Sequence, residues 1–346
     1  MSLDLPMIWA AIIAVAVGLY VLLDGFDLGV GMLFPFAASP KDRDVMIDTI
    51  APIWDGNETW LVLGGGGLFA AFPAAYALLF PALYLPLTLM LAALILRGVA
   101  FEFRLRARDR GKQFWTIAFA GGSTLATVAQ GFVLGGFIQG VRARPDGSGG
   151  LQFAGGPFDW LTPYTMLVTA GLVAGYVLLG AAWLMWRTEH ALHGSARRWA
   201  SLAGVATALA LAAVSLATLY LHPRIAAQWG VTLHGLDWGR IAMLSPIPMI
   251  GAAGLGVLVW GIKAHSHHWP FAGAALVFVS GMLGLAVGFA PYIVPYVMTY
   301  AEAAAAANAQ GLMLVGVAIL LPVILGYTGF VYWTFRGKVS ADAGYH

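Results

Sequence analysis

The fold class follows from one stretch near the start of the chain, which reads MIWAAIIAVAVGLYVLLDGFDLGVGML over Met7–Leu33. A helix needs about 20 consecutive apolar residues to cross the hydrocarbon core of a bilayer, and this stretch exceeds that length. Asp24 and Asp27 are its only charged residues. The stretch therefore predicts a membrane-spanning α-helix with two acids toward one end.

The composition of the whole chain agrees with a membrane protein. Of its 346 residues, 60% are hydrophobic and 10% are charged, and the mean hydropathy is +0.81. Soluble domains carry about 25% charged residues, so the bilayer has to be the solvent for most of this surface. Cysteine is absent from the sequence, which excludes disulfides, iron–sulfur clusters held by cysteine, and thiolate zinc sites.

Further stretches have the length and apolar character of membrane spans. They are Trp60–Leu96, Phe114–Val141, Leu161–Trp186, Trp199–Leu221, Ile241–Ile262, Phe271–Ala290 and Gly311–Phe335. The first of these is too long for one crossing, and Pro73, Pro81 and Pro86 indicate a turn that divides it into two. We therefore predict an all-α polytopic membrane bundle with nine transmembrane helices, and we treat residues 1–346 as a single membrane domain.

Lysine and arginine are distributed unevenly between the two sides of the predicted bundle. Fourteen lie in the odd-numbered connections and the C-terminal tail, namely Lys41, Arg43, Arg97, Arg104, Arg106, Arg108, Arg110, Lys112, Arg187, Arg197, Arg198, Lys263, Arg336 and Lys338. Four lie in the even-numbered connections, namely Arg142, Arg144, Arg224 and Arg240. Because positive residues favour cytoplasmic connections, we expect a periplasmic N-terminus and a cytoplasmic C-terminus.

Asp24 and Asp27 are candidate functional residues because an ionisable group at membrane depth costs about 2.5–3.5 kcal/mol on insertion scales. They are three residues apart and so share one helix face. Gly25 and Gly29 flank them and permit the close approach of another helix. A second interpretation stays open, in which the two acids reach for water near a helix end.

The segment Ile53-Trp-Asp-Gly-Asn-Glu-Thr-Trp60 places two more acids, Asp55 and Glu58, on the same side of the membrane. Asp55 and Asn57 are equally suited to cap the second span, so a helix cap and a proton relay both remain open. Before this segment, Ser39 and Asp42 predict the capped start of a short surface helix that runs to about Thr49.

Arg97 lies near the cytoplasmic end of the third predicted span. A buried arginine needs a carboxylate partner, and Asp24, Asp27 and Asp55 are the candidates. The alternative is that its side chain extends to the lipid headgroups.

The histidines argue against a haem held by this chain, because a membrane haem is commonly held by His or Met inside the bundle. All eight lie in connections, near span ends or at the terminus: His190, His193, His222, His234, His265, His267, His268 and His346. For the group at residues 265–268 we favour a solvated loop over a metal site, because no acid or cysteine accompanies it.

Five stretches together carry a family resemblance. They are Asp24–Met32 (DGFDLGVGM), Ala51–Trp60 (APIWDGNETW), Arg97–Arg104 (RGVAFEFR), Pro291–Pro295 (PYIVP) and Leu321–Val339. With these motifs the chain resembles subunit II of cytochrome bd-type quinol oxidases, including the cyanide-insensitive oxidases, over nearly its whole length.

The resemblance implies a haem-free subunit of a terminal oxidase in the bacterial cytoplasmic (inner) membrane. Haems b and d and the quinol site are then expected on a partner, subunit I, so this chain holds no complete active site and no catalytic, cofactor or metal ligands of its own. The complex couples quinol oxidation to the reduction of oxygen to water and takes protons from the cytoplasm. Small single-helix subunits and a structural quinone or lipid are further expected partners, and a nucleic acid is not.

Two routes for substrates follow as hypotheses. Asp24, Asp27, Asp55 and Glu58 would line a proton route, with Arg97 as the carboxylate partner. Trp60 matches a position that the family resemblance associates with oxygen access, although ordinary core packing explains a tryptophan there equally well. The main alternative from another class is a secondary transporter, which also uses intramembrane acids but predicts a second copy of the Asp24–Asp27 segment that the sequence lacks.

Overall fold

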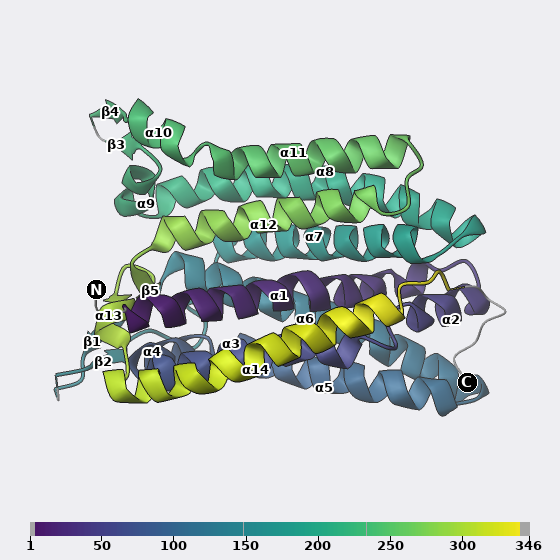
Figure 1. Ribbon diagram of the computed structural model, residues 1–346, viewed down its shortest axis with the longest axis horizontal. Coiled ribbons are helices and arrows are strands. Elements are labelled where there is room, and N and C mark those ends of the chain that lie inside the picture. Colours follow the sequence, from purple (N-terminus) through teal and green to yellow (C-terminus); the bar gives the residue numbers. More distant parts are fainter. Residues whose placement is uncertain (1–3, 148, 233, 340–346) are drawn as a thin grey trace.

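The computed structural model describes residues 4–147, 149–232 and 234–339, and these form a bundle of long helices that run side by side along one axis (Figure 1). The long helices are α1 (Leu5–Leu33), α3 (Trp54–Ala71), α5 (Tyr84–Arg106), α6 (Asp109–Gln139), α7 (Pro163–Arg187), α8 (His190–Leu221), α11 (Pro246–Lys263), α12 (Trp269–Phe289) and α14 (Ala307–Thr334). Within the described residues, eight helices are long and apolar enough to cross a membrane. The bent pair α3 and α4 (Pro73–Ala82) brings the count to nine if it is one span, so the prediction of an all-α multi-span bundle is confirmed.

The predicted division of Trp60–Leu96 is present, but only one of the three prolines marks it. Helices α3 and α4 meet at Phe72 with a bend of 120°, because Pro73 has no backbone N–H to continue the helix. The chain turns again at Leu83 before α5 begins. Pro81 lies inside α4 and Pro86 inside α5, so neither ends a helix.

Several predicted span boundaries differ from the helices, among them the start of the sixth span, predicted at Trp199 where α8 begins at His190, and two others bear on the site and the bundle end. The third span was predicted to end at Leu96, whereas α5 continues to Arg106 and keeps Arg97 inside the helix. The predicted span Ile241–Ile262 is broken at Ser245 into α10 (Trp238–Leu244) and α11. Pro246, at the first position of α11, accounts for the break, since a proline is favourable there and unfavourable inside a helix.

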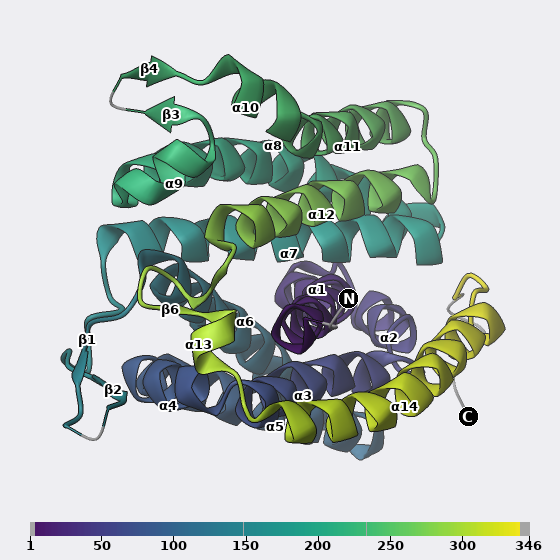
Figure 2. The same cartoon turned by 60° about the vertical axis from the view of Figure 1, so that its left-hand side comes forward.

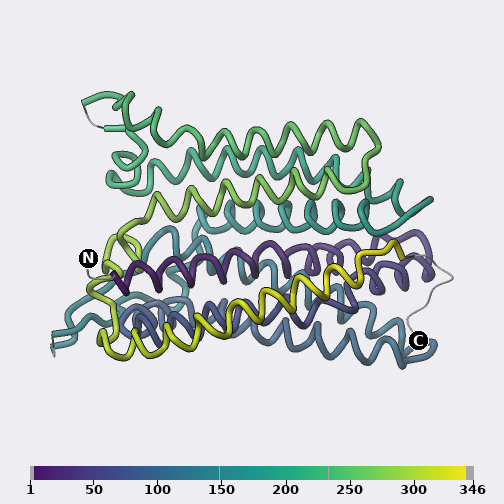
Figure 3. The backbone as a smooth tube through the Cα atoms, in the orientation of Figure 1, coloured from purple at the N-terminus to yellow at the C-terminus, as the bar shows by residue number. Residues whose placement is uncertain are grey.

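Helix α1 begins at one end of the bundle and α14 ends at the other, as an odd number of crossings requires, and the tube in Figure 3 follows the same path. We call the two ends the amino end and the carboxyl end of the bundle. The amino end carries α4, α9 (Pro223–Gln228), α10, α13 (Tyr300–Ala303) and three short antiparallel hairpins. The hairpins are β1 (Ala143–Pro145) with β2 (Leu151–Phe153), β3 (Val231–Thr232) with β4 (Gly235–Leu236), and β5 (Tyr292–Val294) with β6 (Met298–Thr299).

The carboxyl end carries the short helix α2 (Pro40–Asp48), which follows a 3₁₀ turn at Phe34–Phe36. Ser39 Oγ accepts a hydrogen bond of 3.1 Å from the backbone N–H of Asp42, which confirms the predicted cap. Asp44 joins α2 to the bundle by accepting hydrogen bonds from Arg104 and Lys112. Burial alone would raise the pKa of Asp44, but these two bonds outweigh it and hold the pKa below its ordinary value. The contribution of these two bonds to the stability of the fold is therefore present at neutral pH, and it is lost as the pH falls through that lowered pKa.

Helix α1 lies between the two halves of the bundle, with α7 and α12 on one side and α3, α5 and α14 on the other (Figure 2). Glycines bring α1 and α7 into backbone contact. A Cβ atom built on Gly29 would lie 1.9 Å from the carbonyl oxygen of Tyr176, and one on Gly180 would lie 2.4 Å from the carbonyl carbon of Gly29. This is the close approach that the glycine spacing around Asp24 predicted.

The glycine contact can be tested by adding one methyl group. Gly180→Ala should lower the free energy of unfolding by about 1–3 kcal/mol, because the methyl group meets backbone that cannot move aside. Gly281→Ala is the matched control, since a Cβ there has no neighbour within 4 Å. Thermal unfolding of the purified complex measures both, and equal midpoints for the two variants would contradict the close contact.

Candidate functional site

A buried charge cluster joins α1 and α5. Arg97 Nη1 lies 2.6 Å from Asp24 Oδ1, and Arg97 Nη2 lies 3.9 Å from Asp27 Oδ2. The side chains are 1% exposed for Arg97 and 0% for both aspartates. Of the two interpretations left open for Arg97, the carboxylate pairing is present, and the side chain does not extend to the headgroups.

The two acids of α3 beside this cluster differ in their exposure to solvent. Glu58 Oε1 is 3.5 Å from Arg97 Nη1, and its side chain is 25% exposed. Asp55 is exposed in the first turn of α3 and forms no ion pair with Arg97 within the described part of the chain. Asp55 was one of the three candidate partners of Arg97, and that part of the prediction was wrong. The structure brings Asp24, Asp27 and Glu58 to the guanidinium and leaves Asp55 one helical turn from Glu58.

The depth of the cluster follows from the positions of its residues along their helices. Asp24 lies nine residues before the end of α1 at Leu33, and Arg97 lies nine residues before the end of α5 at Arg106. At 1.5 Å per residue, each is about 14 Å inside the carboxyl end of its helix. The cluster is therefore within the span and closer to the carboxyl end of the bundle, where most of the lysines and arginines gather.

An asparagine connects the cluster to α14. Asn57 Nδ2 donates to Asp27 Oδ2 at 2.7 Å and to the carbonyl oxygen of Leu23 at 3.3 Å. Its Oδ1 accepts a bond of 2.9 Å from the hydroxyl of Tyr332. The alternative role of Asn57 as a helix cap was wrong, because α3 begins after Ile53 without a side-chain cap.

A second polar arm runs from Asp24 toward α6 and α7. Tyr176 donates its hydroxyl proton to Gln130 Oε1 at 2.9 Å, and Gln130 Nε2 donates to the Tyr20 hydroxyl at 2.6 Å. The Tyr20 hydroxyl lies near enough to interact with the carboxylate of Asp24. These three residues were not predicted from the sequence, although Gln130, an amide inside an apolar span, is a signal that could have identified this position.

The cluster keeps hydrogen-bonding capacity that protein atoms do not use. Asp24 Oδ2, Asp27 Oδ1 and Arg97 Nε are buried and have no hydrogen-bond partner among the described residues. Buried polar atoms of this kind are commonly satisfied by internal water. These atoms are therefore positions where internal water can bind beside the ion pairs.

Trp60 lies beside the polar region, on the face of α3 toward α1. Its side chain is 2% exposed and packs in an apolar cluster with Ala16 and Tyr20, against Leu321 and Ile324 of α14. The indole N–H has no hydrogen-bond partner among the described residues. The structure thus places Trp60 in the core next to Tyr20.

The described histidines are at helix ends or in connections. His193 and His267 face each other at the carboxyl end with ring centroids 4.7 Å apart, and a ring nitrogen of each is within hydrogen-bond distance of the carbonyl oxygen of Met185. In residues 4–147, 149–232 and 234–339, no three His, Asp or Glu side chains come together to hold a metal ion. His346 lies outside the described residues.

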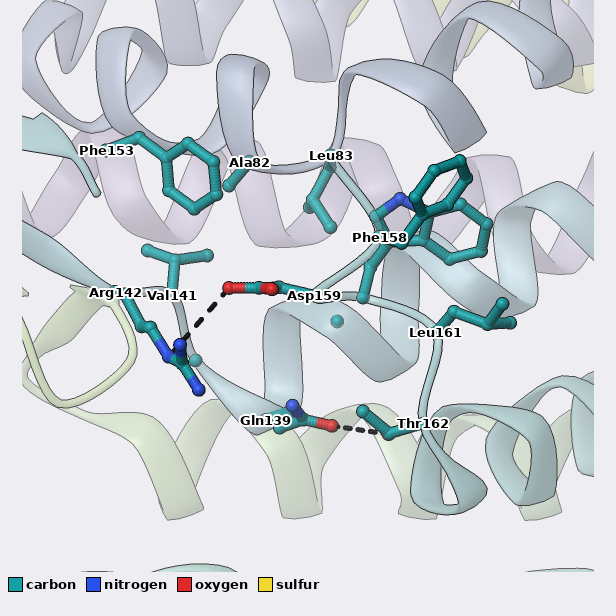
Figure 4. A pocket seen from close by; sticks show the side chains of 13 residues that line it. Ala82, Leu83, Gln139, Val141, Arg142, Phe153, Phe158, Asp159, Leu161 and Thr162 are labelled. Atoms are coloured by element: carbon teal, nitrogen blue, oxygen red, sulfur yellow. Dashed lines mark hydrogen bonds and ion pairs between the residues drawn. The ribbon is translucent and has the colours of Figure 1, made fainter. Parts of the chain in front are cut away.

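A cavity of about 320 Å³ lies at the amino end, far from the charge cluster. Figure 4 shows its wall, where Arg142 and Asp159 form an ion pair of 3.8 Å and Thr162 donates to Gln139 at 2.6 Å. Leu83, at the start of α5, also lines it. Fourteen residues of helix separate Leu83 from Arg97, about 21 Å, so this cavity is not part of the candidate site.

A family model described as cytochrome bd terminal oxidase subunit II matches residues 5–335 of the chain. The chain belongs to this family. Cytochrome bd-I ubiquinol oxidase subunit 2 of Escherichia coli (strain K12) is 27% identical over 365 residues, covering 98% of this chain and 96% of the relative. Cytochrome bd ubiquinol oxidase subunit 2 of Bacillus subtilis (strain 168) is 29% identical over 344 residues, covering 96% of each chain.

The fold of this bd oxidase subunit agrees with a solved structure. A chain of the bd oxidase from Geobacillus thermodenitrificans superposes with a TM-score of 0.75 at 16% identity, covering 97% of this chain and 100% of the other. The family resemblance stated from the motifs is therefore confirmed. The protein is a multi-span subunit of a terminal oxidase complex, an oxidoreductase of respiratory electron transport in the bacterial inner membrane.

The strength of the Arg97 cluster can be tested by removing its only positive charge. Arg97→Leu should lower the free energy of unfolding of the complex by about 3–5 kcal/mol, because it leaves buried carboxylates without a counter-charge. Arg97→Lys keeps the charge and should lose less. Arg106→Leu is the control, since this exposed arginine is on the same helix. If Arg97→Leu unfolds at the same midpoint temperature as Arg106→Leu, the buried ion pairs do not stabilise the complex.

Proposed function

We propose that this chain is the haem-free subunit of a bd-type quinol oxidase and that it conducts protons from the cytoplasm toward its haem-bearing partner. One observation carries the proposal: Asp24, Asp27 and Glu58 share the single guanidinium of Arg97 at membrane depth. Quinol as the electron donor is supported by the relatives from Escherichia coli and Bacillus subtilis, which are named ubiquinol oxidase subunits.

The charge balance explains why such a cluster would hold protons. Three ionised carboxylates and one guanidinium leave a net charge of −2, and an uncompensated buried charge costs several kcal/mol. Binding protons lowers that cost, which favours the uptake of protons from water by the cluster. The same protons can then be released. A purely structural ion pair needs one acid for one arginine, and this cluster has two more.

The graded exposure of the acids gives the route a direction. Asp55 is exposed, Glu58 is a quarter exposed, and Asp24 and Asp27 are buried. Protons would enter at Asp55, pass Glu58 and reach the aspartates through internal water. The lysines and arginines gather at the same end of the bundle, which supports placing this entrance in the cytoplasm and the N-terminus outside.

Haems b and d and the quinol site are assigned to subunit I in this proposal. The described histidines of this chain do not fit axial ligands inside the bundle, because they lie at helix ends or in connections. In this chain the described acids then hold protons and pass them on, while electrons move through the partner. Small single-helix subunits and a bound lipid or quinone remain expected partners. A secondary transporter, the alternative from the sequence, receives no support from the family match or from the relatives.

Neutral variants of the acids test the proton route in the complete oxidase. Asp24→Asn and Asp27→Asn should each slow quinol oxidation and proton uptake in liposomes by on the order of 10²-fold, the range expected when a positioned proton carrier is lost. Glu58→Gln should act in the same direction. Glu102→Gln is the control, because this exposed acid is on α5 away from the cluster. Full turnover with unaltered proton uptake in Asp24→Asn would support a structural scaffold instead.

We also propose that Trp60 borders an apolar route for oxygen toward the partner subunit. Its place in the core between α1, α3 and α14 supports this role, since apolar walls favour a nonpolar gas over water.

Trp60→Ala should widen that route and lower the apparent KM for oxygen, with kcat unchanged. Trp183→Phe is the control, because Trp183 is likewise buried with an indole N–H that has no partner among the described residues. Oxygen titration of quinol oxidation measures both variants, and an unaltered KM in Trp60→Ala would assign Trp60 to packing alone.

A further inference from the structure

A second cavity, of about 260 Å³, lies at the amino end where α12 ends and α9 begins. Its wall combines two arginines with tyrosine, glutamine and apolar groups. The residues that line it are Arg224, Ile225, Ala227, Gln228, Arg240, Gly288, Phe289, Ala290, Pro291, Tyr292 and Tyr296. None of these is an acid.

Both guanidinium groups are held in place by neutral partners. Arg240 donates from Nε to the carbonyl oxygen of Gln228 at 2.7 Å and from Nη2 to Gln228 Oε1 at 2.6 Å. Arg224 donates from Nη1 to the hydroxyl of Tyr292, and its guanidinium carbon lies 5.5 Å from the centre of that ring. Within the described residues neither guanidinium forms an ion pair with an acid, so two positively charged side chains line one cavity.

This placement of charge runs against the trend of the rest of the chain. The amino end has only four arginines and no lysine in its connections, against fourteen basic residues toward the other end. Two of those four arginines line this one cavity. Two like charges in one cavity repel each other unless an anion lies between them, and guanidinium groups pair with phosphate through parallel hydrogen bonds.

We propose that this cavity binds a phosphate group, with the headgroup of an anionic phospholipid as its source. The position of the cavity at the end of a span favours a lipid over free phosphate. Phe289, the last residue of the α12 span, lines it, and Tyr220 and Trp238 nearby in the chain are 89% and 70% exposed. Exposed aromatic residues at the ends of spans are typical of the headgroup region.

The test uses the complete oxidase in nanodiscs with increasing fractions of phosphatidylglycerol in phosphatidylcholine. Native mass spectrometry then counts the phosphatidylglycerol that stays bound. The double variant Arg224→Gln/Arg240→Gln should weaken retention by about tenfold for each guanidinium removed, which is about 1.4 kcal/mol each. Arg224→Lys/Arg240→Lys should keep most of it. Arg144→Gln is the control, as an exposed arginine at the same end that does not line the cavity.

A second measurement on the unaltered complex avoids any failure of the variants to assemble. Phosphatidylglycerol should slow the modification of Arg224 and Arg240 by phenylglyoxal, whereas phosphatidylcholine should not. Protection by inorganic phosphate alone, without lipid, would keep the anion site but overturn the lipid as its source. If the glutamine variant loses subunit I while lipid retention is unchanged, the arginines bind an acidic segment of the partner and the proposal is wrong.

Discussion

The structure depends on one guanidinium in a medium of low dielectric constant. Arg97 pairs with Asp24 and Asp27 of α1 and with Glu58 of α3, so a single side chain of α5 ties three helices together. Because charges attract strongly away from water and are costly there when unpaired, these helices cannot shift independently. The arms through Asn57 and Tyr332 on one side, and through Tyr20, Gln130 and Tyr176 on the other, extend this constraint to α14, α6 and α7.

Close packing around the cluster restricts the movement of these helices further. Glycines bring α7 so close to α1 that Tyr176 lies against Gly25, where an added Cβ would meet its ring at 2.8 Å. The tyrosine hydroxyl is therefore fixed at the height of the acids. In both arms a tyrosine hydroxyl donates to an amide oxygen, which turns the amide N–H groups toward Tyr20 or Asp27. The helices thus hold the acids in defined hydrogen bonds while some of their oxygen atoms stay available for water and protons.

The sequence predicted the helical membrane fold, the division of Trp60–Leu96 and the place of Asp24 and Asp27 inside a span, because hydropathy and charge are local properties of the chain. It named Asp24 and Asp27 as candidate partners of Arg97, but it did not predict Glu58 as a partner or the contacts of Gln130, because such contacts join residues up to 110 apart. Arg97 was placed near the end of a span, since the run of apolar residues stops at Leu96 while the helix continues. Asn57 was considered as a cap because its neighbours resemble a helix start, and only the tertiary fold shows that it reaches Asp27.

We propose that the three carboxylates sharing Arg97 together hold at least one proton in the resting oxidase at neutral pH. Infrared spectroscopy of the complete complex tests it most directly, because a protonated carboxyl group absorbs separately from a carboxylate. The expected spectrum contains a protonated carboxyl band that moves on exchange into heavy water and that weakens in Asp27→Asn and Glu58→Gln. A spectrum with no such band at neutral pH, or a band that is unaltered in both variants, would contradict the account.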